Sequence, residues 1–278
     1  MKKVLGALLL SGFFTAGFSQ VKMPATSPTE YIKQDFGLSS IELTYSRPSL
    51  KGRKMIGDVE PWNVMWRTGA NAATKIKFNE PVEILGHKVD SGSYAIYTIP
   101  QKNGEWTFIL NKGFNNSGID GYQQSADVFR EKIKAGKNMQ KVETLTMQFS
   151  DMKSESCVLN IKWEDFALKI PITVNIKDKI RTQLEAALQS DKKPYWQAAQ
   201  FYSDYDNNKA KAVEMADKAI KENDKPPFYM VYYKAKLQSE AGDKKGALET
   251  AKQSLELSKE AKNNSYVLLS EKLIQASK

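Results

Sequence analysis

The feature that most constrains the fold is a change in hydrophobic periodicity near Lys177. From about Ser39 to Ile176, apolar residues alternate with polar ones, as in strands with one face on a core and the other in water. After Lys177 the apolar residues follow helical spacing, and Ala, Lys, Glu and Leu dominate. The pattern predicts an α+β chain of two domains: an antiparallel β-sandwich or barrel over residues 21–177, followed by an all-α domain over residues 178–278.

Within the first domain, two segments are apolar on both faces. They cover residues 94–99 and 106–110, and the turn residues Gln101–Gly104 between them predict a hairpin. We expect these two strands to be central and covered on both sides. Roughly eight strands are expected in all, with residues 127–136 fitting either a strand or a short helix. Pro171 indicates that its strand lies at an edge or carries a bulge.

The second domain carries a weak internal repeat. Small residues recur at an offset of 35 (247 − 212), close to the ~34 residues of a tetratricopeptide unit. The matching sets are Ala212, Ala216 and Ala219 in one copy and Ala247, Ala251 and Ser254 in the other. The region resembles a pair of degenerate tetratricopeptide hairpins, with helices near 179–190, 194–205, 207–222, 227–241, 244–260 and 263–277. Such a tail can dock on the sheet domain, which we favour, or recruit a protein partner.

The N-terminus has the pattern of a secretory signal peptide over residues 1–20. Met1-Lys2-Lys3 precedes an apolar run from Val4 to Phe14, and small residues lead to Ser19-Gln20. The run is shorter than the ~20 residues of a spanning helix, so cleavage near Ser19 or Gln20 is expected, with an uncleaved anchor as the alternative. We therefore expect an exported protein, periplasmic or extracellular, with no membrane span in the mature chain.

Composition narrows the function classes. The net charge of +9 is spread along the chain without a basic stripe of stacking aromatics, so no nucleic-acid partner is expected. There is no Gly-rich dinucleotide loop, no phosphate loop and no pair of metal-binding histidines, so neither cofactor nor metal is expected. The single cysteine, Cys157, alternates with Leu159, Ile161 and Trp163 along one face of a strand, which fits a small buried residue. The single histidine, His87, fits an exposed turn, and the polar run 204–208 fits helix capping rather than calcium binding.

The densest polar stretch is Trp66-Arg67-Thr68-Gly69-Ala70-Asn71, within a segment running from Ser46 to Lys112. Basic loop residues that converge offer fork-shaped donors to a carboxylate, sulfate or phosphate, and tryptophan can stack on a sugar ring. The candidate ligand-binding residues are Arg47, Lys51, Arg53, Trp66, Arg67 and Asn71. The alternative is a structural corner, in which Trp66 fills the core while Arg67 and Asn71 tie loops to backbone carbonyls.

The ordered motifs of this segment resemble a known family. They are Ser46-Arg47-Pro48, Lys51-Gly52-Arg53, Gly57, the Trp66–Asn71 run with Ala73-Thr74, Gly92-Ser93-Tyr94 with Tyr97-Thr98-Ile99-Pro100, and Trp106-Thr107 with Asn111-Lys112. Over residues 25–176 the chain is similar to the secreted bacterial domain-of-unknown-function family 2911. The resemblance implies a signal peptide and brings no established activity. This chain departs from it at Glu60-Pro61-Trp62-Asn63, where many relatives look closer to Val-Pro-Tyr-Gly.

Three functions follow, in order of preference. The first is a non-enzymatic secreted binding module, whose β-domain recognises an acidic small molecule or glycan through its Arg, Trp and Asn loops. The second is an envelope scaffold that binds a protein partner through the helical tail. The third is an uncharacterised hydrolase, with Asp58, Glu60, Arg67 and His87 as its site.

Overall fold

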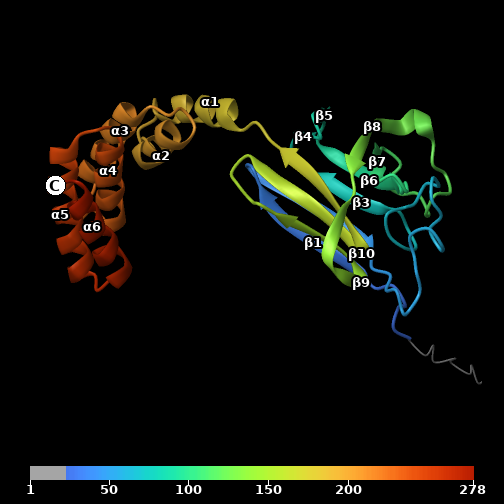
Figure 1. Ribbon diagram of the computed structural model, residues 1–278. Coiled ribbons are helices and arrows are strands. Elements are labelled where there is room, and N and C mark those ends of the chain that lie inside the picture. Colours follow the sequence, from blue (N-terminus) through green and yellow to red (C-terminus); the bar gives the residue numbers. More distant parts are fainter. Residues whose placement is uncertain (1–22) are drawn as a thin grey trace, which may run out of the picture.

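The computed structural model describes residues 23–278, so the expected signal peptide lies outside the described residues. Figure 1 shows a β-rich part followed by a stack of helices at the end of the chain. The strands are β1 (Thr29–Phe36), β2 (Ser39–Ser46), β3 (Thr74–Phe78), β4 (Val82–Ile84), β5 (His87–Val89), β6 (Gly92–Ile99), β7 (Glu105–Asn111), β8 (Asp127–Lys134), β9 (Gly136–Ser150) and β10 (Ser156–Thr173). The helices are α1 (Lys177–Ala187), α2 (Tyr195–Asp204), α3 (Lys209–Lys221), α4 (Phe228–Glu240), α5 (Lys244–Glu260) and α6 (Asn264–Ala276).

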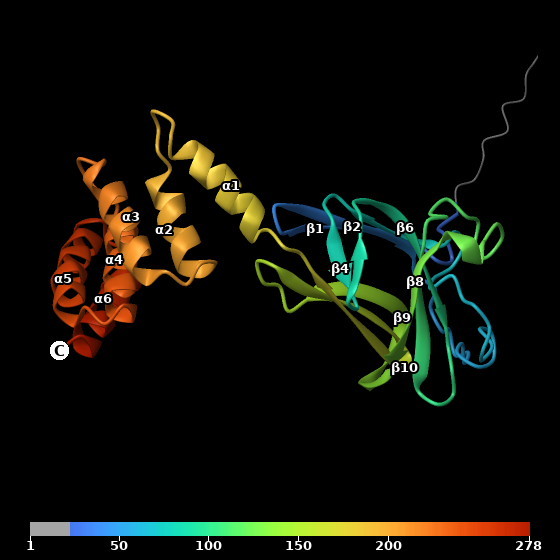
Figure 2. The ribbon, with the colours of Figure 1, turned by 90° about the horizontal axis from the view of Figure 1, so that it is seen from above.

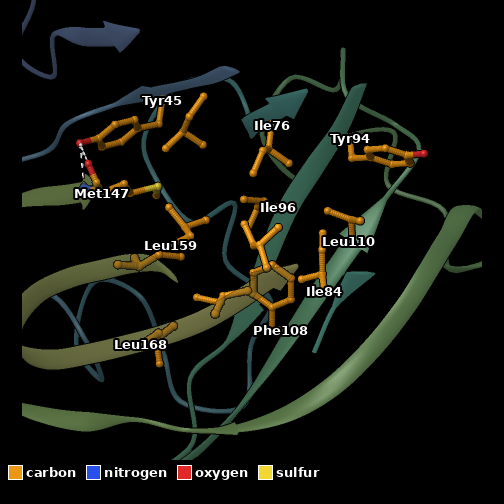
Figure 3. Packing of buried hydrophobic residues seen from close by; sticks show 14 of the residues in the cluster. Tyr45, Ile76, Ile84, Tyr94, Ile96, Phe108, Leu110, Met147, Leu159 and Leu168 are labelled. Atoms are coloured by element: carbon orange, nitrogen blue, oxygen red, sulfur yellow. Dashed lines mark hydrogen bonds between the residues drawn. The ribbon is translucent and has the colours of Figure 1, made fainter. Parts of the chain in front are cut away.

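The strands form two antiparallel sheets around one core. One sheet has the order β1-β2-β3-β6-β7-β8 and the other β5-β4-β10-β9. Inward side chains of both sheets, such as Ile76 and Ile96 of the first and Leu159 and Leu168 of the second, meet between them (Figure 3). Neither sheet closes on itself over residues 23–278, so the expected α+β chain is confirmed with a sandwich and not a barrel.

The two strands predicted to be central are central. β6 and β7 lie side by side inside the larger sheet and are buried on both faces. Their outer face is covered by loops rather than by a second layer of strands or helices. Tyr97 and Ile109 form a small outer core there, against which Met65 and Tyr122 of two loops pack.

Strand β10 merges two segments of the sequence pattern into one strand of 18 residues. Glu164 lies at a break in its register with β9 and has a φ of 49°, which marks a bulge. Pairing with β9 ends at Ala167, so Pro171 lies beyond that ladder. Its carbonyl oxygen accepts from the N–H of Leu85, the residue that follows β4 on the other side. The ambiguous segment 127–136 is strand β8 followed by the start of β9. Cys157 is buried, as expected, and burial raises its pKa to about 11.

One edge of the sandwich is sealed by the chain itself. After β2 the chain crosses to the free edge of β9, where Pro48 O accepts from Leu145 N and Leu50 N donates to Glu143 O, both at 2.9 Å. The Tyr45 hydroxyl accepts from Met147 N at 2.8 Å, as drawn in Figure 3. We call the run of residues 45–51 along β9 the sealed edge.

At the opposite edge, β5 and β8 are joined through side chains. The expectation that His87 is an exposed turn residue is wrong: Leu85 and Gly86 make the turn and His87 begins β5. Its ring is stacked on Phe129 of β8, with centroids 4.4 Å apart, and its Nε2 lies 3.0 Å from Glu131 Oε2. We call this contact the bridged edge.

All six predicted helices are present, with ends within a few residues of the expected ones. Asn208 caps α3 by accepting from Lys211 N, as its position predicted. Figure 2 shows the helices following the end of β10, and Ile180 and Tyr205 pack against the sandwich core. None of the helices in residues 23–278 is long and apolar enough to cross a membrane. The same residues hold no cluster of three or more His, Cys, Asp or Glu side chains suited to a metal.

Candidate functional site

Trp66 anchors the dense loop in the core. Its backbone forms a bridge with Thr98 of β6, with N–H to O distances of 2.7 and 3.0 Å. Its indole Nε1 donates to Gly69 O at 3.0 Å, and its ring stacks on Trp163 with centroids 5.4 Å apart. At 2% exposure, Trp66 holds the loop in place and offers no face to solvent.

Thr68 and Asn71 adopt left-handed backbone conformations, with φ of 53° and 60°. A β-branched residue rarely adopts this conformation, and the surrounding contacts hold it there. The buried Thr68 hydroxyl lies 3.1 Å from Thr98 Oγ1, and Thr68 O accepts from Thr74 Oγ1 at 2.7 Å. The loop between Trp66 and Thr74 is therefore fixed in shape by buried contacts with β3 and β6.

That shape directs Arg67 away from the core. Its Nη1 donates to Asn71 O at 2.8 Å, which closes the loop on itself. The guanidinium lies against the backbone of Gly118, where a Cβ would come within 2.6 Å of Nη1. Gly118, with a φ of 69°, thus lets the 112–126 loop approach the arginine closely.

Arg67 faces a surface pocket of about 350 Å³. Polar side chains from three separate stretches of chain converge on this pocket, and Trp163 lies at its base. The lining residues are Ser27, Pro48, Arg53, Met55, Glu60, Arg67, Gly69, Ala70, Asn71 and Trp163. Three of the six predicted binding residues, Arg53, Arg67 and Asn71, therefore share one pocket.

Ion pairing distinguishes the two pocket arginines from the others. Arg47, Arg130 and Arg181 each pair with a carboxylate. Within residues 23–278, Arg53 and Arg67 are the arginines with no carboxylate oxygen within 4.0 Å, and both line the same pocket. Arg53 donates to Leu50 O and Ser49 O, both at 3.0 Å, so its guanidinium is fixed by backbone and not neutralised.

Glu60 adds a carboxyl group to the pocket. Burial raises the pKa of Glu60, and the positive charge of Arg67 opposes that rise. No hydrogen bond or ion pair to its carboxyl group is found in the described part of the chain. A half-buried carboxyl group without a partner can accept hydrogen bonds from hydroxyls, so the pocket suits a ligand that carries both an anionic group and hydroxyls.

The other predicted residues lie elsewhere. Arg47 is part of the sealed edge, donating to Leu145 O at 3.1 Å and pairing with Glu30, and Lys51 is exposed beyond the pocket. Asp58 is exposed and pairs with Lys54, and His87 is at the bridged edge. Of the residues considered for hydrolysis, only Glu60 and Arg67 share the pocket.

Trp163 is the pocket residue that sequence reasoning assigned only to the core. The alternation around Cys157 correctly predicts that it faces inward, and it is 3% exposed. Its presence at the pocket follows from its stack on Trp66, a contact across 97 positions that no local pattern reveals. Ser27 and Pro48 also line the pocket, and they too are brought there by contacts between segments that are distant in the sequence.

The described domain is thus a two-sheet antiparallel sandwich whose Trp66–Asn71 loop borders a pocket that holds Arg53 and Arg67. Residues 27–172 match the family described as "Protein of unknown function (DUF2911)", which covers more than half of the chain. The chain therefore belongs to this family, and the resemblance drawn from its motifs is confirmed. No curated protein and no solved structure matches the chain.

Proposed function

We propose that the β-sandwich domain is a binding module for an anionic small molecule or glycan, held in the pocket of Arg53, Arg67 and Asn71. The observation that carries the proposal is the convergence of two arginines without carboxylate partners on one pocket. Unpaired guanidinium groups held in fixed positions favour bidentate recognition of carboxylate, sulfate or phosphate.

The rigid loop supports this role. Thr68 is held in an unfavourable left-handed backbone conformation by buried hydrogen bonds, and strain of this kind concentrates at binding sites. Because Arg67 is already oriented by Asn71 O, little side-chain entropy is lost when a ligand binds. Asn71 adds an amide that can accept from a ligand hydroxyl while its own Nδ2 donates to Ser46 Oγ at 3.3 Å.

The test is calorimetric titration with monomeric acidic sugars: glucuronate, galacturonate, N-acetylneuraminate and glucose 6-sulfate. Arg67→Ala removes the charge-assisted hydrogen bonds, so we expect Kd to rise about 10- to 100-fold for whichever probe binds. Arg67→Lys keeps the positive charge but cannot form the two parallel hydrogen bonds of a guanidinium, so its Kd should lie between those of wild type and Arg67→Ala.

Lys169→Ala is the matched control, because it removes one positive charge from an exposed position on β10 outside the pocket. Its Kd should equal that of wild type. If all four sugars bind Arg67→Ala as tightly as wild type, or none binds at all, the proposal is wrong.

Export of the protein is part of the same proposal. The charged and apolar N-terminal pattern supports cleavage near Ser19 or Gln20 and a periplasmic or extracellular location. Mass spectrometry of the protein purified from its native cells checks this: a mature N-terminus at Gln20 or Val21 supports export, and an intact Met1 contradicts it.

A second candidate function is a scaffold that uses the helices as tetratricopeptide-like repeats. Small residues at the repeated positions, among them Ala212, Ala216, Ala247 and Ala251, are completely buried, which supports close packing of helical hairpins. Deleting residues 178–278 should then remove proteins that co-purify with the chain, and an unchanged set would count against a scaffold.

A further inference from the structure

A second pocket, of about 260 Å³, shares a wall with the first. Its lining is rich in charged groups, with two aromatic rings beside them: Gly52, Arg53, Lys54, Ile56, Trp62, Lys141, Glu164, Asp165 and Phe166. Arg53 is the residue that lines both pockets. A molecule that occupies both must therefore pass along the guanidinium of Arg53.

We infer that the site takes an extended acidic glycan, with one sugar in each pocket and the Arg53 guanidinium at the junction between them. This rests on the proposed function and names its ligand class. Each pocket alone is near the lower end of the roughly 300–1,000 Å³ typical of small-molecule sites, and the two together lie well within that range.

Trp62 supplies the surface for a sugar ring in the second pocket. Its indole packs edge-on against Phe166, with centroids 5.9 Å apart, and is half-buried. Gly57 supports it from behind, since a Cβ there would come within 2.3 Å of Trp62 Nε1, and its φ of 97° also favours glycine. An indole fixed in this way offers an apolar face to the C–H face of a sugar.

The charges of the second pocket favour a glycan over a denser polyanion. Lys54 is paired with Asp58 at 3.4 Å, whereas Lys141 of β9 has no carboxylate oxygen within 4.0 Å in residues 23–278. Asp165 is exposed at the same pocket, and Glu60 lies in the first. These carboxyl groups repel a phosphate chain but accept hydrogen bonds from sugar hydroxyls, while Arg53, Arg67 and Lys141 bind carboxylates spaced along a chain.

Glu164 fixes the wall between the pockets and is not available to a ligand. Its carboxylate is 4% exposed and accepts from Met55 N at 2.8 Å and Ile56 N at 2.9 Å. These two residues alternate between the pockets, Met55 lining the first and Ile56 the second. The carboxylate thereby holds the strip of chain that carries Arg53 at one end and Glu60 at the other.

The test compares galacturonate with its dimer and tetramer by calorimetric titration of wild type and two variants. In wild type we expect the tetramer to bind at least about tenfold more tightly than the monomer, because the second sugar binds intramolecularly once the first is held. Lys141→Ala, at an exposed strand position, should reduce tetramer affinity about tenfold and leave monomer affinity unchanged. Arg67→Ala should weaken both.

The outcomes separate this inference from the proposed function. Monomer binding that depends on Arg67, with no gain in the tetramer or no effect of Lys141→Ala, overturns the extended site and leaves the proposed function standing. Tighter binding of tripolyphosphate than of the tetramer overturns the glycan class. If no galacturonate binds and the other acidic sugars fail as well, both are overturned.

Discussion

The two edges of the sandwich are closed in different ways, and the proposed binding surface lies beside one of them. At the sealed edge, the chain itself runs along β9, and backbone and buried side-chain hydrogen bonds join the two sheets. At the bridged edge, one histidine–glutamate contact and one ring stack join β5 and β8. Both pockets lie beside the sealed edge, where the backbone is most constrained.

This arrangement follows from what a binding site needs. A loop can hold arginines in fixed positions only when its own backbone hydrogen bonds are satisfied elsewhere. Backbone groups of Pro48 and Leu50 bond to β9, and the strip that follows is held by Glu164. The bridged edge uses partly exposed side chains, which contribute little to stability.

The largest expected effect is at Glu164. Glu164→Ala leaves the buried N–H groups of Met55 and Ile56 without an acceptor, so we expect the free energy of unfolding to fall by roughly 2–4 kcal/mol. Urea unfolding followed by tryptophan fluorescence measures it. Asp165→Ala, at the exposed neighbouring position, is the control and should change it by less than about 0.5 kcal/mol. Equal effects of the two variants would show that the strip is not held by the carboxylate.

The next effect is at Tyr45. Tyr45→Phe keeps the ring but leaves Met147 N without its acceptor inside the sealed edge, which should cost about 1–3 kcal/mol. Tyr31→Phe is a matched control, because the exposed Tyr31 hydroxyl donates only to Glu42 at the surface. A Tyr45→Phe protein as stable as Tyr31→Phe would mean that the sealed edge is held by the backbone alone.

The pKa of Tyr45 determines the pH range over which its hydroxyl stabilises the sealed edge. Burial, together with its hydrogen bond to Glu30, raises the pKa of Tyr45 to about 12. The contribution of Tyr45 to stability should therefore stay constant between pH 5 and pH 9, because its phenol is neutral there in the folded protein and also in the unfolded chain, where the pKa of tyrosine is about 10.

The sequence predicted local features well and distant contacts poorly. Alternation identified the inward faces of β2, β3 and β9, and helical spacing with capping residues identified all six helices, because both depend on neighbours within a few positions. The motif Trp66–Asn71 correctly placed Arg67 and Asn71 together. The motifs could not show that Arg47 lies outside the pocket whereas Arg67 lines it. The guanidinium of Arg47 donates hydrogen bonds to β9, about a hundred residues later in the sequence.

The same reason explains the error at His87. Gly86 correctly indicated a turn, but the partner that makes His87 a strand residue with a defined role is Glu131, 44 positions away. Two of the basic residues of the proposed extended site, Arg53 and Lys141, are separated still further in the sequence. Charge convergence of this kind becomes visible only once the register of the sheets is known.

The smallest expected effect is at the bridged edge, and it depends on pH. The hydrogen bond from His87 holds the pKa of Glu131 below its usual value of 4.5. A lowered carboxyl pKa means that the contact adds stability above about pH 4.5 and loses it as the pH falls through the lowered pKa. Glu131→Gln should therefore be less stable than wild type at pH 6, by less than the Tyr45→Phe effect, and the gap should close in acid.

Glu83→Gln is the control, because Glu83 is exposed on neighbouring β4 and is not part of the bridge. Its difference from wild type should be small at pH 6 and should not follow the titration of Glu131. If Glu131→Gln instead shows a gap as large as Glu164→Ala, the two edges hold the sandwich equally. The fixed position of the pocket arginines would then depend on the shape of the Trp66–Asn71 loop and not on the closure of the neighbouring edge.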